Sequence, residues 1–399
     1  MKVLVLSFYY KPDLCAGSFR TTALVKQLLE TLPEETSVEV ITTLPNRYSS
    51  FSSEASEIEV QPRLTIKRIK LPKHKSGMVD QAKAFITYAL GVLSLAKRGE
   101  YDLVYGTSSR LMTAVLSAVV AKKKKVPLYL DIRDIFVDTI GDVLSWKVAL
   151  FLKPIFSQME RFAINRANKV NLVSYGFAGY FGSRYPNQQY SYFTNGVDEE
   201  FVSVLPNVTR SSTAVVDTAT VLYAGNMGEG QGLHAIIPEL AKRLEERVKF
   251  RLIGDGGRRR ALEERLQELG CENVELLSPV KRETLIQEYL SADVLFLHLN
   301  AYPAFEKVLP SKLFEYAAMG KPVWAGLSGY SEQFVRSEIS NAEVFLPCDV
   351  DGAVRALNRL SLQDADREGF IEKYSRDNIM HAMAKDIVSL LSKEESVEV

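Results

Sequence analysis

Two charged residues near the start of an expected helix have the chemistry to bind a nucleotide diphosphate. Lys312 and Glu315 lie in residues 303–323 (PAFEKVLPSKLFEYAAMGKPV), where a proline-interrupted loop meets small and apolar residues. Residues three apart share a helix face, and Ser311 is a candidate N-cap that places this face where the dipole favours phosphate. The lysine would neutralise diphosphate oxygens, and the carboxylate would accept hydrogen bonds from a ribose diol. The alternative interpretation is a plain surface ion pair.

Two glycine-rich segments, each following an apolar run, could hold the phosphates. Residues 223–233 (YAGNMGEGQGL) contain Gly225 and Gly228, and residues 254–257 (GDGG) begin with Gly254 and precede a charged helical pattern. Glycine lets backbone N–H groups approach an anion closely. We interpret both segments as phosphate-binding loops; flexible surface turns are the alternative.

A third apolar run is followed by candidate charged residues in the first half of the chain. Asp131, Arg133 and Asp134 follow residues 128–130. Since polar residues after a parallel strand project into a ligand crevice, we expect these three at a binding site. A structural Arg–Asp pair is the alternative.

Strands that alternate with amphipathic helices must position all of these residues, a pattern typical of parallel sheets. We predict strands at 3–7, 38–42, 64–67, 103–105, 128–131 and 169–173, then at 220–224, 250–253, 274–276, 294–297, 322–325 and 343–346. The expected fold class is α/β, with two doubly wound Rossmann-like lobes that face a cleft. We place the first lobe at 1–202, the second at 203–375, and a returning helix within 376–399.

Composition excludes several classes of protein. Lysine plus arginine balances aspartate plus glutamate at 49 each, so no overall field attracts nucleic acid. The cysteines form no CxxC pair and the histidines show no ligand spacing, so we expect no metal and no cofactor. We interpret Asp351, in a D-x-D pair, as a helix cap. Residues 84–96 are too short to span a bilayer and the N-terminus lacks a signal peptide, which favours the cytoplasm.

The segment around Lys312 and Glu315 resembles the donor-binding signature of family 4 glycosyltransferases, retaining enzymes of the GT-B fold. Other segments are similar to that family's motifs, in the same order. They are residues 12–20 (PDLCAGSFR, the acceptor-side glycine loop, with Gly17 at its turn), 195–201 (NGVDEEF), 225–233 (the second-lobe glycine loop), 254–256 (GDG) and 280–285. The forms IRD, AGNMG and PSK-x-x-E most resemble the N-acetylfucosaminyltransferase-like subgroup of O-antigen and capsule synthesis.

The resemblance implies transfer of a sugar, an N-acetylated hexose or deoxyhexose, from a UDP-sugar to a lipid-linked or oligosaccharide acceptor in bacterial surface polysaccharide synthesis. The implied donor-binding residues are Gly225, Asn226, Gly228, Gly254, Asp255, Val280, Lys307, Pro310, Ser311, Lys312, Leu313 and Glu315. The implied catalytic residues are Asp134, Arg133, Lys312 and Glu315, and the implied acceptor-binding residues are Gly17, Arg20, Asp131 and Arg133.

Four positions depart from the family pattern. Lys307 stands at the first position of the usual E-x7-E pair, Asn226 and Gln231 stand where arginine and lysine are usual, and Arg133 stands where a histidine is usual. The positive charge at the diphosphate would then come from Lys307, Lys312 and Arg20. Two alternatives are a GT-B nucleotide-sugar epimerase and a non-catalytic nucleotide-sugar-binding partner of another glycosyltransferase, and the departures at Arg133 and Lys307 keep the second open. An epimerase needs more acids and bases than these loops contain.

A basic and aromatic region could contact the cytoplasmic face of the inner membrane. Residues 143–156 (VLSWKVALFLKPIF) mix aromatic residues with two lysines, and residues 122–125 are four consecutive lysines. Such a surface would suit a lipid-linked acceptor. A buried helix beside a solvated lysine run is the alternative.

Overall fold

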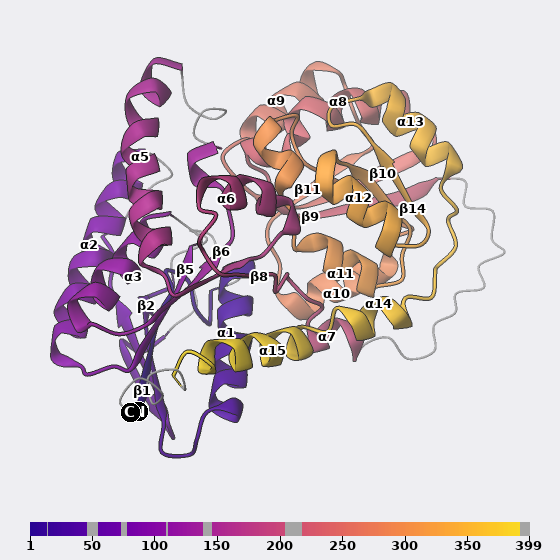
Figure 1. The fold of residues 1–399 in the computed structure, drawn as a ribbon. Helices are drawn as coiled ribbons and strands as arrows, with labels where there is room; N and C mark the ends of the chain where they lie inside the picture. Colours follow the sequence, from indigo (N-terminus) through magenta and orange to yellow (C-terminus); the bar gives the residue numbers. More distant parts are fainter. Residues whose placement is uncertain are drawn as a thin grey trace. The chain divides into compact units, whose positions relative to one another are not determined.

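Two sheets divide the chain into two α/β units (Figure 1). The computed structural model describes residues 1–13, 15–45, 55–72, 78–108, 111–138, 146–203 and 218–391. The first unit comprises Met1–Asn195 with Arg376–Val399, and the second comprises Gly196–Ser375. The expected fold class, two Rossmann-like lobes of the α/β class, is confirmed. Residues 204–217, which follow the predicted lobe boundary at 202, lie outside the described part.

The first unit contains an eight-stranded sheet of order β3-β4-β2-β1-β5-β6-β7-β8, in which only the edge strand β3 is antiparallel to its neighbour. The strands are β1 (Lys2–Leu6), β2 (Ser37–Thr43), β3 (Ile58–Gln61), β4 (Leu64–Ile69), β5 (Leu103–Ser108), β6 (Leu128–Ile132), β7 (Lys169–Leu172) and β8 (Tyr190–Ser191). The helices are α1 (Ala16–Thr31), α2 (Met78–Arg98), α3 (Leu111–Lys124), α5 (Trp146–Arg166), η1 (Tyr175–Phe177), α6 (Ala178–Arg184) and α15 (Arg376–Val388).

Helices cover both faces of this sheet. β1 alternates its side chains, so Val3 and Val5 join a core with α1 and α15. The opposite face is covered by α2, α3 and α5, with α3 packed against the other two (Figure 1). Both faces are buried, which explains why the central strands read as continuous apolar runs.

The second unit contains a parallel six-stranded sheet of order β11-β10-β9-β12-β13-β14. The strands are β9 (Ala219–Asn226), β10 (Val248–Asp255), β11 (Val274–Leu277), β12 (Val294–His298), β13 (Val323–Gly326) and β14 (Ala342–Phe345). The helices are α7 (Glu199–Val202), η2 (Glu229–Gln231), α8 (Leu233–Arg243), α9 (Arg259–Glu268), α10 (Arg282–Ser291), η3 (Pro303–Lys307), α11 (Lys312–Ala318), α12 (Gly329–Glu338), α13 (Val350–Arg359) and α14 (Glu368–Lys373). One core lies under α8, α9 and α13, and the other under α10, α11 and α12.

The chain order of the strands reverses between β9 and β12, and doubly wound sheets bind ligands at such a switch point. All the predicted strands are present; β3 and β8, both short edge strands, were not predicted. The interpretation of Asp351 as a helix cap is wrong. Asp349 is the N-cap of α13 and accepts from the Gly352 N–H, whereas Asp351 pairs with Arg243.

The connection between the units belongs to the second unit, a few residues earlier than the predicted boundary at 202. The Val197 N–H donates to the Tyr374 carbonyl at 2.8 Å, and Phe201 is buried in the second core. The two segments by which the chain passes between units therefore lie side by side. Beyond them α15 packs on α1 in the first unit, and residues 392–399 lie outside the described part.

Candidate functional site

Two glycines bring neighbouring strand ends close together in the second unit. Gly225 in β9 and Gly254 in β10 are register partners with φ of 151° and 152°, values that favour glycine. A Cβ on Gly254 would lie 1.8 Å from the Gly225 carbonyl oxygen. Arg259 donates to the Gly254 carbonyl at 2.6 Å. Glycine is therefore required at 254 by the close approach of the Gly225 backbone.

The Lys312 side chain extends to this glycine backbone. A Cβ on Gly225 would lie 2.1 Å from Lys312 Nζ, so the ammonium group occupies the space that the missing side chain leaves. Lys312 Nζ also lies 5.9 Å from the centre of the Tyr223 ring, within cation–π range. The fold thus places a positive charge at the carboxyl end of β9, next to the switch point.

Glu315, one turn further along α11, is held from a neighbouring helix. The Tyr289 hydroxyl of α10 donates to Glu315 Oε2 at 3.1 Å. Tyr289 is fully buried, and burial together with the Glu315 charge raises its pKa well above the usual value, so it remains a donor. The adjacent Tyr316 hydroxyl accepts from the Ala224 N–H at 3.2 Å, which ties α11 to the end of β9. Lys312 and Glu315 therefore have fixed positions relative to the glycine backbone.

Residues of the connection motif NGVDEEF (195–201) contact Arg282, the first residue of α10. Arg282 forms ion pairs with Asp198 and Glu200, and its guanidinium lies 4.6 Å from the centre of the Phe201 ring. Burial lowers the pKa of Arg282, but Asp198 and Glu315 outweigh this effect and raise it above its usual value. These contacts hold α7 against α10, the helix that carries Tyr289, whose hydroxyl donates to Glu315. Sequence reasoning missed Arg282, although the acids of the motif were a signal for a basic partner.

The loop after β9 is held by hydrogen bonds. Asn226 Nδ2 donates to Gln231 Oε1 at 2.7 Å. His298 Nδ1 donates to the Gln231 carbonyl at 2.7 Å, while His298 Nε2 accepts from the Cys348 N–H at 2.9 Å. This pairing requires the neutral imidazole, and burial lowers the pKa of His298 to about 4. No local sequence pattern indicated this role of His298.

The remaining predicted donor residues follow strands of the same sheet. Val280 follows β11, and Lys307 and Pro310 follow β12; all three are half-buried. Gly228 lies in the loop after β9, and Asp255 accepts from the Gly256 N–H at 2.8 Å. The second sheet therefore brings these residues to its carboxyl edge.

Two details of the α11 prediction are corrected. Ser311 stands at the N-cap, but its side chain makes no capping hydrogen bond. Leu313 is fully buried in the core and its N–H donates to the Pro310 carbonyl at 3.2 Å, so its side chain cannot contact a ligand. Because α11 has only seven residues, the side-chain charge of Lys312 replaces the helix dipole as the source of positive potential.

In the first unit, Arg20 and Asp131 form a buried ion pair, which overturns their assignment as acceptor-binding residues. Both side chains have no exposed surface. Arg20 Nε and Nη2 donate to the two Asp131 oxygens at 2.8 and 3.0 Å, and further Arg20 hydrogen bonds reach the Phe193 and Thr194 carbonyls. Tyr105 and Asn171 also donate to Asp131. Both residues are thus structural, which also removes Arg20 as a source of charge at the diphosphate.

Replacing Asp131 by alanine should lower the free energy of unfolding by about 3–5 kcal/mol, because it leaves the buried Arg20 charge without a partner. Urea denaturation followed by circular dichroism measures this change. Glu245→Ala breaks an exposed pair with Lys242 and should change stability by less than about 1 kcal/mol. Equal effects of the two substitutions would contradict the structural role of Asp131.

Gly17, Arg133 and Asp134, by contrast, gather at the carboxyl edge of the first sheet. A Cβ on Gly17 would lie 2.7 Å from Arg133 Nη1. Within the described part of the chain, the buried Nε and Nη1 atoms of Arg133 meet no hydrogen-bond acceptor. Asp134 is exposed to solvent, yet the surrounding protein partly desolvates its carboxyl and raises its pKa to about 6, while Arg133 acts in the opposite direction. The arrangement presents hydrogen-bond donors for an anion beside a carboxyl group with a raised pKa.

The chain is similar in sequence to known glycosyltransferases. Residues 207–377 match the family described as glycosyl transferases group 1. The chain is 25% identical over 361 residues to the colanic acid biosynthesis glycosyl transferase WcaI of Escherichia coli (strain K12), covering 83% of this chain and 84% of that protein. The second unit is a group 1 glycosyltransferase domain. The protein is therefore an enzyme of the glycosyltransferase type.

Solved structures of glycosyltransferases have the same fold as this chain. WaaG, a glycosyltransferase involved in lipopolysaccharide biosynthesis, matches with a TM-score of 0.65 and 15% identity over 98% of both chains. Anabaena Alr3699/HepE, solved in complex with UDP, matches with a TM-score of 0.57 and 18% identity over 99% of this chain and 98% of that one. These similarities establish the GT-B fold.

The loop after β9 contains no basic side chain at the two positions where the resemblance to family 4 implies one. Asn226 and Gln231 stand there and bind each other, and the ammonium group that lies against Gly225 belongs to Lys312. Among the described residues, no group of His, Cys, Asp and Glu is arranged to hold a metal ion. No helix in the described ranges has the length and apolar character needed to cross a membrane.

Proposed function

We propose that this enzyme is a retaining glycosyltransferase that uses a UDP-sugar and transfers an N-acetylated hexose or deoxyhexose. The observation that carries the proposal is the position of Lys312 Nζ against Gly225, beside a carboxylate held by Tyr289. An ammonium group at a bare backbone turn suits a diphosphate, and Glu315 suits a ribose diol. The UDP complex of the similar HepE supports uridine as the base.

In the proposed reaction, the bond between the anomeric carbon and the diphosphate oxygen breaks, and its electron pair stays on the phosphate. The acceptor hydroxyl oxygen bonds to the anomeric carbon on the face that the phosphate leaves, and its proton passes to a phosphate oxygen. Lys312, with Lys307, stabilises the negative charge that develops on the diphosphate. This scheme needs neither a protein nucleophile nor a metal ion, and activity should therefore persist in EDTA.

We propose a lipid-linked or oligosaccharide acceptor of bacterial surface polysaccharide synthesis. Support comes from the names of the relatives, since WcaI is a colanic acid enzyme and WaaG a lipopolysaccharide enzyme. In the first unit, the buried N–H groups of Arg133 would bind an acceptor phosphate, and Asp134 would orient the sugar hydroxyl. In this proposal, the Arg133 guanidinium beside Gly17 forms the anion site.

Incubation of the enzyme with candidate UDP-sugars and a bacterial membrane extract tests the proposal. Release of UDP with sugar recovered in the lipid fraction supports transfer. A changed free sugar nucleotide would instead assign epimerisation, and binding without turnover would assign a non-catalytic partner. The anomeric configuration of the product, read by NMR, decides between retention and inversion.

Activity should fall as the pH is lowered through about 6. The raised pKa means that Asp134 is protonated below about pH 6 and is an ionised acceptor above it. Asp134→Asn should lower kcat by about 10²-fold and remove this acidic limb, because the amide does not titrate in this range. A pH profile of kcat for both proteins measures the effect.

The pH profile needs a control for loss of folding. Asp102→Asn changes an exposed carboxylate that accepts from the Lys2 backbone N–H, away from the proposed site, and should keep the acidic limb. If Asp134→Asn also keeps the limb at unchanged kcat, Asp134 has no role in the reaction.

A further inference from the structure

Exposed aromatic side chains gather at one edge of the first sheet. Among the described residues, four aromatic side chains are exposed, and all four belong to the first unit. Phe136, Tyr175 and Tyr192 follow β6, β7 and β8, three neighbouring parallel strands, whereas Phe162 lies on α5. Because parallel strands end at the same edge of a sheet, the first three residues lie at the carboxyl edge, where ligands bind in such folds.

Tyr175 and Tyr192, here called the tyrosine pair, have little cover. The two residues are 61% and 43% exposed, and their ring centres lie 4.9 Å apart with the ring planes tilted by 55°. The neighbouring Tyr190, by contrast, is tied into the fold, since its hydroxyl donates to the carbonyls of Phe181 and Tyr185 at 3.1 Å each. The tyrosine pair therefore leaves aromatic surface open to a ligand.

Tyr192 has a fixed direction, because side chains alternate along extended backbone. On one side of it, the Ser191 hydroxyl donates to Asp386 of α15 at 2.6 Å, and on the other side Phe193 packs in the core that α15 completes. Tyr192 must then face the opposite way, where its ring meets Tyr175. A surface that is already ordered loses little conformational entropy when it binds a ligand.

The tyrosine pair lies near the proposed acceptor residues. The Val173 N–H donates to the Ile132 carbonyl at 3.1 Å, so the loop that carries Tyr175 begins beside the loop that carries Arg133 and Asp134. Neighbouring strands are about 4.8 Å apart, which places β8 roughly 10 Å from β6, two strands away. One acceptor saccharide can therefore reach both the tyrosine pair and these two residues.

The segment that carries the tyrosine pair is aromatic, polar and nearly uncharged. Residues 170–195 contain eight aromatic side chains and one charged side chain, that of Arg184, although 25% of the whole chain is charged. Serine, asparagine and glutamine make up much of the remainder. Antibody binding surfaces have a similar composition, in which rigid tyrosine rings supply contact area and small polar side chains supply hydrogen bonds. The lack of charge argues against nucleic acid or an anionic lipid as the ligand.

We propose that the tyrosine pair binds a neutral sugar ring of the acceptor. The C–H groups on a pyranose face are weakly positive, which suits the negative face of an aromatic ring. The phenol hydroxyls can also donate to and accept from sugar hydroxyls. This assignment rests on the proposed function, because it gives the acceptor saccharide a subsite beside Arg133 and Asp134. The tyrosine pair would then contribute to acceptor specificity.

Saturation-transfer NMR of the full chain with three neutral disaccharides, cellobiose, lactose and N,N′-diacetylchitobiose, tests the proposal. We expect saturation of the ring C–H protons of at least one disaccharide. The double variant Tyr175→Ala with Tyr192→Ala should lower this signal at least fivefold, because aromatic anchors carry much of the affinity of a binding surface. The double variant Tyr175→Phe with Tyr192→Phe keeps the rings and should retain more than half of the signal.

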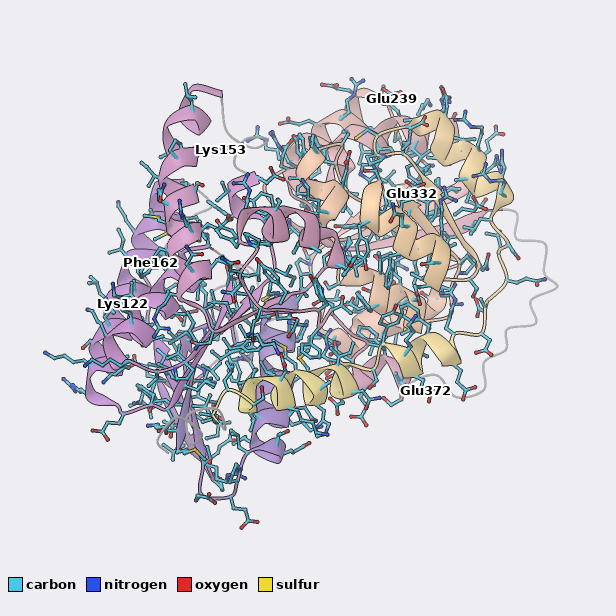
Figure 2. The ribbon with its side chains drawn as sticks, in the orientation of Figure 1. Lys122, Lys153, Phe162, Glu239, Glu332 and Glu372 are labelled. Carbon is cyan, nitrogen blue, oxygen red and sulfur yellow. The ribbon has the colours of Figure 1, made fainter. Side chains whose placement is uncertain are left out.

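Phe162→Ala is the matched control for the loss of an exposed aromatic ring. Phe162 is 36% exposed, and Lys122 Nζ lies 5.9 Å from the centre of its ring (Figure 2). It lies in the second half of α5, toward the amino edge of the sheet, because crossover helices run antiparallel to the strands. This variant should bind the disaccharides as the wild type does. The side chains of Trp146 and Phe151, in the segment predicted to contact a membrane, lie outside the described part.

Kinetics with the membrane extract gives a second measurement. The double alanine variant should raise the apparent KM for the acceptor about tenfold and change kcat less than twofold, because a contact remote from the reacting atoms is equally strong in the ground and transition states. Thermal unfolding should match that of the wild type, since both tyrosines are exposed. A fall in kcat at unchanged KM would overturn the proposal.

Absence of signal from all three disaccharides, an undiminished signal from the double alanine variant, or an equal loss in Phe162→Ala would also overturn it. A dimer that the double alanine variant abolishes, without saccharide binding, would instead assign the tyrosine pair to self-association. UDP titration by calorimetry separates the two proposals, because the tyrosine variants should keep UDP affinity. Disaccharide binding by a wild-type protein that neither binds nor uses UDP would contradict the proposed function and leave the tyrosine pair as a saccharide site.

Discussion

Replacing Lys312 by alanine should lower kcat/KM for the UDP-sugar by about 10³-fold, or about 4 kcal/mol in transition-state stabilisation. The ammonium group lies against the Gly225 backbone, where the diphosphate is proposed to bind, so its removal leaves the departing phosphate charge without this partner. Steady-state kinetics of UDP release measures the loss. Calorimetry should show a large loss of affinity for UDP and a small one for uridine, which has no phosphate.

Two variants make this result specific. Lys312→Arg keeps the charge and should recover part of the activity, although its planar head does not reproduce the geometry of the ammonium group. Lys242→Ala removes an exposed lysine of α8 that pairs with Glu245, and it should leave kcat/KM unchanged. Full activity of Lys312→Ala would remove this residue from the site.

Replacing Glu315 by glutamine should weaken UDP binding by about 10²-fold. A carboxylate accepts two charge-assisted hydrogen bonds from a ribose diol, each worth about 1.5–3 kcal/mol, whereas the amide accepts at one oxygen only. The sharper measurement compares UDP with 2′,3′-dideoxy-UDP. The wild type should strongly prefer UDP, and the variant should lose most of this preference.

Tyr289→Phe is the matched test of how Glu315 is positioned. It removes the hydroxyl that donates to Glu315 Oε2 at 3.1 Å and leaves the carboxylate in place. We expect a weaker effect on UDP affinity, about tenfold, with the preference for UDP over the dideoxy analogue reduced but present. If Glu315→Gln discriminates between the two nucleotides as the wild type does, Glu315 does not bind the diol.

The sequence was informative where local patterns suffice. Central strands buried on both faces appear as apolar runs, and loops that follow parallel strands lie at one edge, so the pattern alone placed Lys312, Gly225 and Gly254 together. The resemblance of ordered motifs then indicated a glycosyltransferase, which the comparisons bear out. Short edge strands such as β8 were missed because two residues carry too little periodicity.

The partners of charged side chains depended on long-range contacts. Arg20 and Asp131 are 111 positions apart, and only the tertiary structure shows that they bind each other. Tyr289 and Glu315, and His298 and Cys348, meet for the same reason. These pairs have no sequence spacing that a pattern could detect.

Residue type and position after a strand thus made Lys312, Glu315 and the glycine loops candidates for a site, and their binding role stays a prediction. Tertiary structure decided which charges are available to a ligand. It buried Arg20 and Asp131 as a mutual pair and left the buried N–H groups of Arg133 beside Gly17. The physical reason is that burial and pairing depend on neighbours distant in the chain.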